Sequence, residues 1–257
     1  MPRTARKKSD TGIYHIMLRG INKQSIFLDR EDNEKFLNII SECKKISGFE
    51  LFAYCLMGNH SHLLIKEGSE PLGQVFKRIG VRFVYYFNMK YKRNGHLFQD
   101  RYKSEPIESE SYLLTVLRYI HRNPVKARLA KSVEGYRWSS YHAYIKQDNS
   151  LVDTESVLEL FDDDKQEALR QFREYNDKES HDKCLEMQEK KRILDDELIK
   201  IIEKKLKVRA FDIQAMPRDR MIDSIKKVAA IKGVSTRQIA RVTGISANII
   251  RQVSRAE

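Results

Sequence analysis

Two apolar runs separated by a two-residue turn constrain the fold of this chain more than any other feature. The runs are FELFAYCLM (49–57) and HSHLLIKE (60–67), and only Gly58 and Asn59 lie between them. Two strand-forming runs joined by two turn residues predict a β-hairpin, in which neighbouring strands are antiparallel. An antiparallel sheet must therefore include residues 49–67.

The segments around this hairpin predict the rest of the sheet and its helices. Alternating apolar positions predict strands, and apolar positions at helical spacing predict helices. Strands are predicted over 12–21, 49–57, 60–67 and 95–107, and helices over 29–46, 71–92 and 110–124. The last helix is expected to stop at Pro124, since the residue before a proline disfavours the helical backbone. This order predicts an α+β fold, a ferredoxin-like antiparallel sheet with helices on one face.

Positive charge is divided between two parts of the chain. Residues 1–150 hold 26 Lys and Arg against 15 Asp and Glu, residues 151–200 hold 9 against 16, and residues 201–257 hold 13 against 5. Two basic blocks around an acidic one indicate two surfaces for a polyanion, most simply nucleic acid. The alternative is a generally basic protein with no such partner.

The length of 257 residues suits one large domain or two. We expect a sheet domain over 1–150, an acidic helical connector over 151–191 and a helical domain over 192–257. The three cysteines lie far apart and match no zinc or disulfide pattern. The basic start is not followed by an apolar segment, and no run is long enough to span a bilayer. These features predict a cytoplasmic protein with no membrane partner.

The sequence His60-Ser61-His62 opens one of the predicted strands. Side chains two apart on a strand point the same way, so both imidazoles can hold one divalent cation. Imidazole suits transition metals, and it can hold catalytic magnesium or manganese when phosphate oxygens complete the shell. The alternative is two ordinary polar residues, because this pattern alone is weak.

The helix predicted over 110–124 carries a possible reactant. Tyr119 and Asn123 are four residues apart, so they lie one above the other on the helix. A phenol beside an amide, with histidines on the neighbouring sheet, suits nucleophilic attack on phosphorus while a metal polarises the phosphate. The alternative is an ordinary half-buried tyrosine.

Several stretches resemble the single-tyrosine HUH transposases. GNHSHLLI (58–65) is similar to their histidine motif and RYIHRNPVKARL (118–129) to their tyrosine helix. Three more stretches resemble the REP-associated branch of that family: RGINKQSIF (19–27), GHLFQDRYKS (95–104) and WSSYHAY (138–144). The resemblance covers roughly residues 10–145, and the small Ser61 departs from the bulky residue usual in the motif.

This resemblance implies a metal-dependent endonuclease and strand transferase that acts on single-stranded, hairpin-forming DNA through a 5′-phosphotyrosine intermediate. It makes His60, His62 and Asn123 ligands of Mg²⁺ or Mn²⁺ and Tyr119 the nucleophile. Tyr112 is the rival nucleophile, although Val116 and not a polar residue follows it by four. Both a monomer and a homodimer are compatible with the family.

Further DNA contacts are expected beside this site. Tyr102 is a candidate for stacking on unpaired bases, because aromatic rings stack on any base. Lys103 is a candidate phosphate contact on the same predicted strand.

Residues 219–256 have the pattern of a helix-turn-helix. Ser235 and Ser246 are natural N-caps, and Gly244 lies in the turn. The segment resembles the C-terminal DNA-binding domain of the replication initiator family. That resemblance implies duplex DNA as a partner, with contacts from Arg237, Arg241, Ser246, Asn248, Arg251 and Arg255. The alternative is a three-helix module that binds protein.

Three functions therefore remain open. The first is a transposase-like enzyme, which needs His60, His62, Tyr119 and Asn123 together. The second is a non-catalytic regulator that binds DNA hairpins and keeps the fold. The third is a metal phosphoesterase that uses water, which does not need Tyr119.

Overall fold

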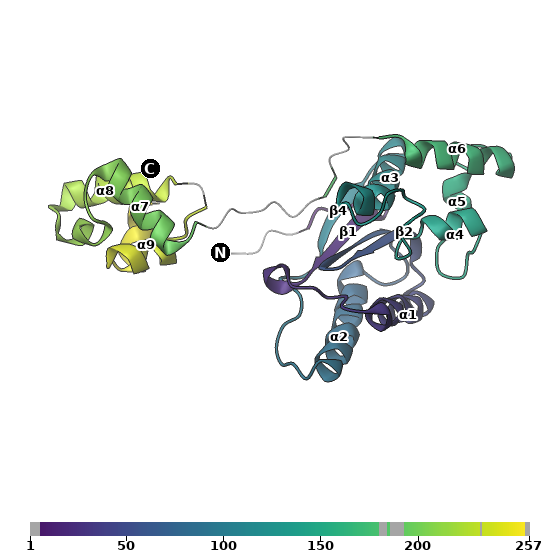
Figure 1. The fold of residues 1–257 in the computed structure, drawn as a ribbon, viewed down its shortest axis with the longest axis horizontal. Coiled ribbons are helices and arrows are strands. Elements are labelled where there is room, and N and C mark those ends of the chain that lie inside the picture. Colours follow the sequence, from purple (N-terminus) through teal and green to yellow (C-terminus); the bar gives the residue numbers. More distant parts are fainter. Residues whose placement is uncertain (1–5, 180–183, 186–192, 232, 255–257) are drawn as a thin grey trace. The chain divides into compact units, whose positions relative to one another are not determined.

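The computed structural model describes residues 6–179, 184–185, 193–231 and 233–254, and the chain divides into two units, 1–186 and 187–257 (Figure 1). The first unit is built on a four-stranded antiparallel sheet of β1 (Ile13–Arg19), β2 (Glu50–Met57), β3 (His60–Lys66) and β4 (Lys103–Ile107). The strand order is β2-β3-β1-β4. The predicted α+β class and the four antiparallel strands are confirmed.

Three helices complete the sandwich, α1 (Arg30–Ser47), α2 (Leu72–Lys90) and α3 (Glu110–Lys126). The start of α1 is fixed by a capping box, in which the Asp29 and Asp32 side chains each accept the other's backbone N–H. Its end is fixed by Gly48 in the left-handed region, with φ of 63°. The Ser109 side chain caps α3 by accepting the N–H of Tyr112.

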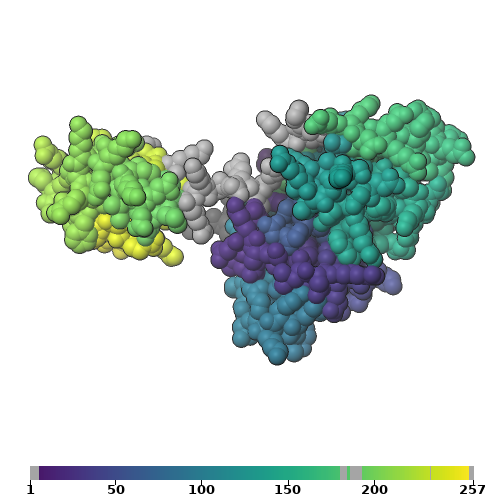
Figure 2. Space-filling view, viewed as in Figure 1, coloured from purple at the N-terminus to yellow at the C-terminus, as the bar shows by residue number. Residues whose placement is uncertain are grey.

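The helices α2 and α3 cover opposite faces of the sheet. Successive side chains of β1 point to opposite sides; His15 contacts Tyr119 of α3, whereas Leu18 lines a groove with Phe76 of α2. Figure 1 shows α2 on one side of the sheet and α3 on the other, and Figure 2 shows the surface of the same segments in the same colours. Helices on one face were predicted, which holds for α1 and α2 but not for α3. The reason is that β1 and β3 are buried on both faces, so both faces need cover.

Two predicted boundaries also differ. The fourth strand begins at Lys103, and residues 95–102 contribute only an isolated bridge between Phe98 and Gly20. The third helix runs past Pro124 to Lys126. A proline lacks its own N–H and crowds the carbonyl four residues before it, but the residues that follow can still donate. The Ala127 N–H donates to the Asn123 carbonyl.

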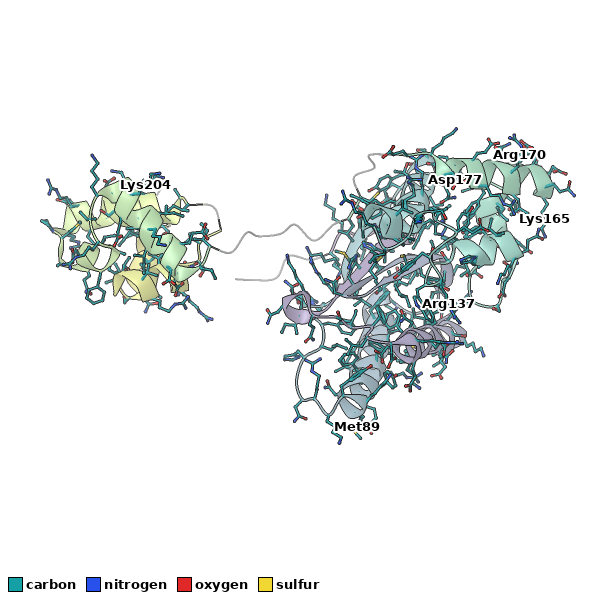
Figure 3. The ribbon with its side chains drawn as sticks, in the orientation of Figure 1. Met89, Arg137, Lys165, Arg170, Asp177 and Lys204 are labelled. Carbon is teal, nitrogen blue, oxygen red and sulfur yellow. The ribbon has the colours of Figure 1, made fainter. Side chains whose placement is uncertain are left out.

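Residues 152–177 belong to the core of the first unit, so the predicted connector is wrong for this part. Helices α4 (Tyr141–Lys146), α5 (Glu155–Leu158) and α6 (Lys165–Asp177) lie here or just before it. Phe172 of α6 is fully buried and stacks on Tyr144, with ring centroids 4.5 Å apart. Lys165, Arg170 and Asp177 lie on the exposed side of α6, which explains the highly charged appearance of this segment (Figure 3). The rest of the predicted connector lies largely outside the described residues.

The second unit is all-helical, with its own apolar core. It contains α7 (Asp195–Leu206), a 3₁₀ turn (Ala210–Ala215), α8 (Arg218–Ala229), α9 (Thr236–Thr243) and α10 (Ala247–Val253). Ser235 and Ser246 cap α9 and α10 as predicted. Gly244 ends α9 at φ of 74°, and a Cβ there would lie 2.6 Å from Gln214. Among the helices of both units that the structure describes, none is long and apolar enough to cross a membrane.

Candidate active site

Three imidazoles and one phenol meet on the face of the sheet that α3 covers. The ring centroid of His62 lies 5.0 Å from that of His60 and 5.1 Å from that of His15. The Tyr119 ring lies 5.7 Å from His62 and 5.8 Å from His15. The residues come from β3, β1 and α3, so this cluster forms only when the sheet pairs and the helix docks.

The sheet register explains why the histidines converge. Strand β1 pairs with β3 so that Arg19 is opposite His60 and Met17 is opposite His62. His15 lies two residues before Met17, so its side chain falls on the same face. Lys103 of β4 is opposite Met17 and shares this face, which places an exposed ammonium group at the edge of the same row.

Each histidine of β3 uses Nδ1 for a hydrogen bond within the protein. His60 Nδ1 lies 2.6 Å from Asn59 Oδ1, and His62 Nδ1 lies 2.9 Å from His15 Nε2. An amide oxygen only accepts, so His60 Nδ1 carries the proton. In both rings Nε2 is then the nitrogen that can bind a cation.

The hairpin turn that carries His60 is itself held by the loop after β1. The Gly20 N–H donates to the Asn59 carbonyl at 2.9 Å, and the Ile26 N–H donates to the Gly58 carbonyl at 2.8 Å. The Asn59 side-chain amide donates to the Lys23 carbonyl at 3.2 Å. The orientation of the His60 ring therefore depends on this loop.

His15 and Glu105 were not recognised from the sequence. His15 is fully buried, and its Nδ1 has no hydrogen-bond partner among the described residues, although Glu105 Oε2 lies 3.7 Å away. A proton on Nδ1 facing this carboxylate leaves Nε2 as an acceptor for the His62 Nδ1–H. Strand spacing could have identified His15, because His15, Met17 and Arg19 are two residues apart and point to the same face of β1.

Burial keeps the imidazoles of this cluster neutral. It lowers the pKa of His60 to about 4, helped by the nearby Arg19 charge, and the pKa of His62 falls well below its usual value. The pKa of His15 is also lowered by burial, with Glu105 acting in the opposite direction. Neutral imidazole is the form that binds a metal ion.

Asn123 lies one turn after Tyr119 and is 8% exposed. Its Nδ2 has no hydrogen-bond partner within the described part of the chain. A buried N–H donor without a partner is costly, so the position suits an acceptor such as a phosphate oxygen. No three His, Cys, Asp or Glu side chains of the described residues are placed to hold a metal. Among the residues of this site, the atoms able to bind a cation are the Nε2 atoms of the two imidazoles and the Asn123 amide oxygen.

Two cations flank the cluster and were not recognised from the sequence as site residues. Arg19 lies opposite His60, and its Nε is buried with no partner among the residues described. The Lys126 ammonium lies 5.5 Å from the centre of the Tyr119 ring. A phosphodiester at this cluster would therefore meet the positive charge of Lys126 near Tyr119 and that of Arg19 near His60.

The second tyrosine of α3 is placed differently. The Tyr112 hydroxyl donates to Glu105, and burial and this carboxylate raise its pKa. Its phenol is thus tied to the carboxylate behind His15, whereas the Tyr119 ring faces His62.

Tyr102 lies away from this cluster, and two groups cover its ring. The Phe76 ring centroid is 4.6 Å away, and the Arg6 guanidinium lies 3.8 Å from the ring centre. A stacked base would have to displace one of them, so the structure does not favour stacking on this ring in its present position.

The predicted contacts of the second unit are only partly accessible. Arg237, Asn248 and Arg251 are exposed. Arg241 is paired with Asp195 through two contacts of 2.5 and 2.8 Å. The exposed Ser246 uses its hydroxyl to cap α10, and Arg255 lies outside the described residues.

Comparisons with known proteins relate part of the chain to transposases. Residues 8–123 match the family model described as IS200-like transposase, a stretch that runs from before β1 to Asn123. No curated protein matches the chain.

Two solved structures are similar to the chain. One is a REP-associated tyrosine transposase bound to a REP hairpin, with 20% identity, a TM-score of 0.51, and coverage of 59% of this chain and 88% of the other. The other is a putative transposase from Deinococcus radiodurans, with 16% identity, a TM-score of 0.34, and coverage of 47% and 97%. The first supports the fold assignment, and the second adds no argument.

Proposed function

We propose that this protein nicks and rejoins single-stranded DNA at hairpins, as a transposase-like, metal-dependent enzyme with Tyr119 as its nucleophile. The observation that carries the proposal is the Tyr119 ring, 5.7 Å from His62 and 5.8 Å from His15, on a sheet face with two flanking cations. The match of residues 8–123 to the IS200-like transposase model supports the class of enzyme.

His60, His62 and Asn123 would hold Mg²⁺ or Mn²⁺. When bound, the ion would supply Lewis acidity to a phosphate oxygen and orient the phosphodiester. The protein contributes a dry, fixed setting, since His62 is 2% exposed and both imidazoles have their Nδ1 atoms engaged.

The chemistry then follows from the phenol. The Tyr119 oxygen attacks phosphorus and loses its proton, and the bond from phosphorus to the 3′ oxygen breaks. That oxygen takes a proton and leaves as a 3′-hydroxyl, while Tyr119 stays joined to the 5′ phosphate. Attack by a 3′-hydroxyl on this bond reverses the step and rejoins the strand. Arg19 and Lys126 stabilise the charge that builds on the phosphate oxygens.

His15 is a positioning residue in this scheme. It would accept from His62 Nδ1–H and so leave the lone pair of His62 Nε2 available to a cation. Glu105 holds His15 in the required tautomer. Partners of this kind typically change metal affinity or activity by about 10–100-fold.

The test is a hairpin oligonucleotide with a single-stranded flank and a label at either end. With Mg²⁺ or Mn²⁺, the 3′-labelled piece should migrate with the protein on a denaturing gel, and the 5′-labelled piece should be released with a 3′-hydroxyl. Cleavage without a covalent adduct would indicate a water nucleophile. Binding without cleavage would indicate a regulator.

We also propose that the second unit contacts duplex DNA beside the hairpin. The support is the short pair α9 and α10 joined at Gly244, with Arg237, Asn248 and Arg251 exposed. Arg241 joins this set only after it releases Asp195. Arg251→Ala should weaken preference for one base by about 1–3 kcal/mol if the residue reads a base edge.

A further inference from the structure

A groove of about 590 Å³ lies between α2 and residues 96–102. Leu18 of β1 lines it, and this side chain points to the face opposite His15 and Met17. The groove is therefore separated from Tyr119 by the thickness of the sheet. Its volume falls within the range of about 300–1,000 Å³ that ligand pockets occupy.

The helix that forms one wall carries two glycines on the groove side. Gly73 and Gly80 are seven residues apart on α2, two helical turns, and both line the groove. A Cβ added at either position would meet nothing within 4 Å. Packing therefore does not require glycine here, although glycine within a helix costs about 1 kcal/mol relative to alanine. Because the two glycines have no side chains, they leave space beside α2 for another molecule.

The remaining lining is aromatic and cationic. Phe76, Phe98 and Tyr102 supply rings, and Lys77 and Arg101 are exposed at the groove. The Arg6 guanidinium covers the Tyr102 ring, and its Nη2 donates to the Tyr102 carbonyl at 3.0 Å. Rings combined with cations recognise a base and its phosphate, the chemistry of single-stranded nucleic-acid sites.

We propose that this groove binds an unpaired nucleotide of the DNA strand that flanks the hairpin. The base lies over Gly73 and Gly80 beside the half-buried Phe98 ring, and Lys77 and Arg101 hold the neighbouring phosphates. The inference rests on the proposed action on DNA, but it assigns a separate binding site on the other face of the sheet. The groove sets affinity and position for the flank, and the chemistry takes place at Tyr119.

Filling the groove without disturbing the fold tests this assignment. Gly80→Leu adds a side chain into the open space, and Val81→Leu is the matched control on the same helix, since Val81 is 63% exposed and does not line the groove. Fluorescence anisotropy of the full chain would measure binding to a hairpin with a single-stranded flank and to the same hairpin without one. Melting temperatures report folding.

Gly80→Leu should bind the flanked hairpin at least about tenfold more weakly than the control, while both variants bind the bare hairpin equally. The melting temperature should not fall, because leucine is the better helix former. If Gly80→Leu does not fold, the double variant Gly73→Ala/Gly80→Ala replaces it, with the same direction expected. Equal affinity of filled and control variants for the flanked hairpin would overturn the assignment.

Two further arms identify the occupant. Thymidine monophosphate should compete with the flanked hairpin only weakly; full competition at concentrations similar to the oligonucleotide would mean that free nucleotides are the ligand and would overturn the strand assignment. A covalent adduct in the wild type tests Tyr119 separately. Loss of flank binding in Gly80→Leu supports the groove even where the wild type forms no adduct.

Discussion

The two faces of the sheet in the first unit differ in burial and in how their charged side chains are exposed. The face under α3 holds His15, His62 and Tyr119, all less than 10% exposed and fixed by contacts between strands and helix. The face under α2 ends in an open groove whose cations Lys77 and Arg101 are exposed. Both are built from the same strands, because alternate residues of β1 point to opposite sides.

One strand can therefore contribute to a buried cluster on one face and to an open groove on the other. A reacting group must be held within a fraction of an ångström, which favours burial and neighbouring hydrogen bonds. A flank of variable sequence needs rings and long cationic side chains that adjust to it. Changes on the α3 face should therefore affect rate and metal affinity, and changes on the α2 face should affect DNA affinity.

The largest expected effect is at the nucleophile. Tyr119→Phe keeps the ring and removes the attacking oxygen, so covalent adduct should fall by about 10⁴-fold or more, since deleting a nucleophile can cost about 10⁶-fold. Binding of the hairpin should persist in the anisotropy assay. Tyr112→Phe is the matched control and should keep adduct formation, because its hydroxyl is tied to Glu105. An adduct in Tyr119→Phe that is absent in Tyr112→Phe would reverse the assignment.

The next effect tests whether the α3 face depends on its buried neighbours. His15→Phe removes the acceptor for His62 Nδ1, and metal affinity measured by calorimetry should fall by about 10–100-fold. His15→Gln keeps an acceptor and should recover most of it. The ¹⁵N shifts of His62 should show a proton on Nδ1 in the wild type and a mixture in His15→Phe. An unchanged tautomer in that variant would remove His15 from the scheme.

Acid should destabilise the packing of α3 against α6 and the start of α4. His121 is fully buried, and its two nitrogens lie 2.9 Å from Asn176 Oδ1 and 2.8 Å from Ser140 Oγ. Burial lowers its pKa to about 4, with His142 adding to the shift and Asn176 opposing it. Because the folded pKa is lower than the unfolded value, this stability is present above about pH 6.5 and is lost as the pH falls toward 4.

The loss between pH 7.5 and pH 5 should be about 2 kcal/mol in the free energy of unfolding from this residue. His60, His62 and His15 also have lowered pKa values and add their own acid sensitivity. Urea unfolding of the wild type and of His121→Gln at both pH values isolates the His121 share. An equal loss in both proteins would mean that His121 does not titrate across the transition.

The smallest effect concerns the second unit. Removing residues 187–257 should change nicking of a short hairpin by less than about twofold, because the first unit holds the whole candidate site and its own core. Affinity for a hairpin with a duplex arm should fall, since a second contact raises the effective concentration. That lost affinity should depend strongly on salt. Equal binding of truncated and full chains at low salt would favour a protein-binding role.

The sequence was sufficient for the elements whose cause is local. Neighbouring residues alone determine three of these features: the turn at Gly58 and Asn59, the caps Ser235 and Ser246, and the spacing of His60 and His62. The four-stranded antiparallel sheet was also predicted, because the βαββαβ order of elements favours a ferredoxin-like arrangement.

What the sequence did not show depends on contacts between distant segments. His15 joins the cluster only through the pairing of β1 with β3, and Glu105 only through β4. Residues 152–177 looked like a polar connector because their few apolar residues, such as Phe172, pack one side of a short helix. The groove on α2 depends on Gly73 and Gly80, and helix propensity alone counts glycine as unfavourable in a helix.

The anchored turn between β2 and β3 has a consequence for how this chain can vary in length. Hairpin turns are ordinarily where insertions are tolerated. Here the backbone of Gly58 and Asn59 accepts hydrogen bonds from Ile26 and Gly20, and the Asn59 side chain holds His60. One inserted residue would shift the strand register and send both β3 histidines to the opposite face. Natural length differences should therefore gather in the exposed loop around residues 147–150, while this turn keeps two residues.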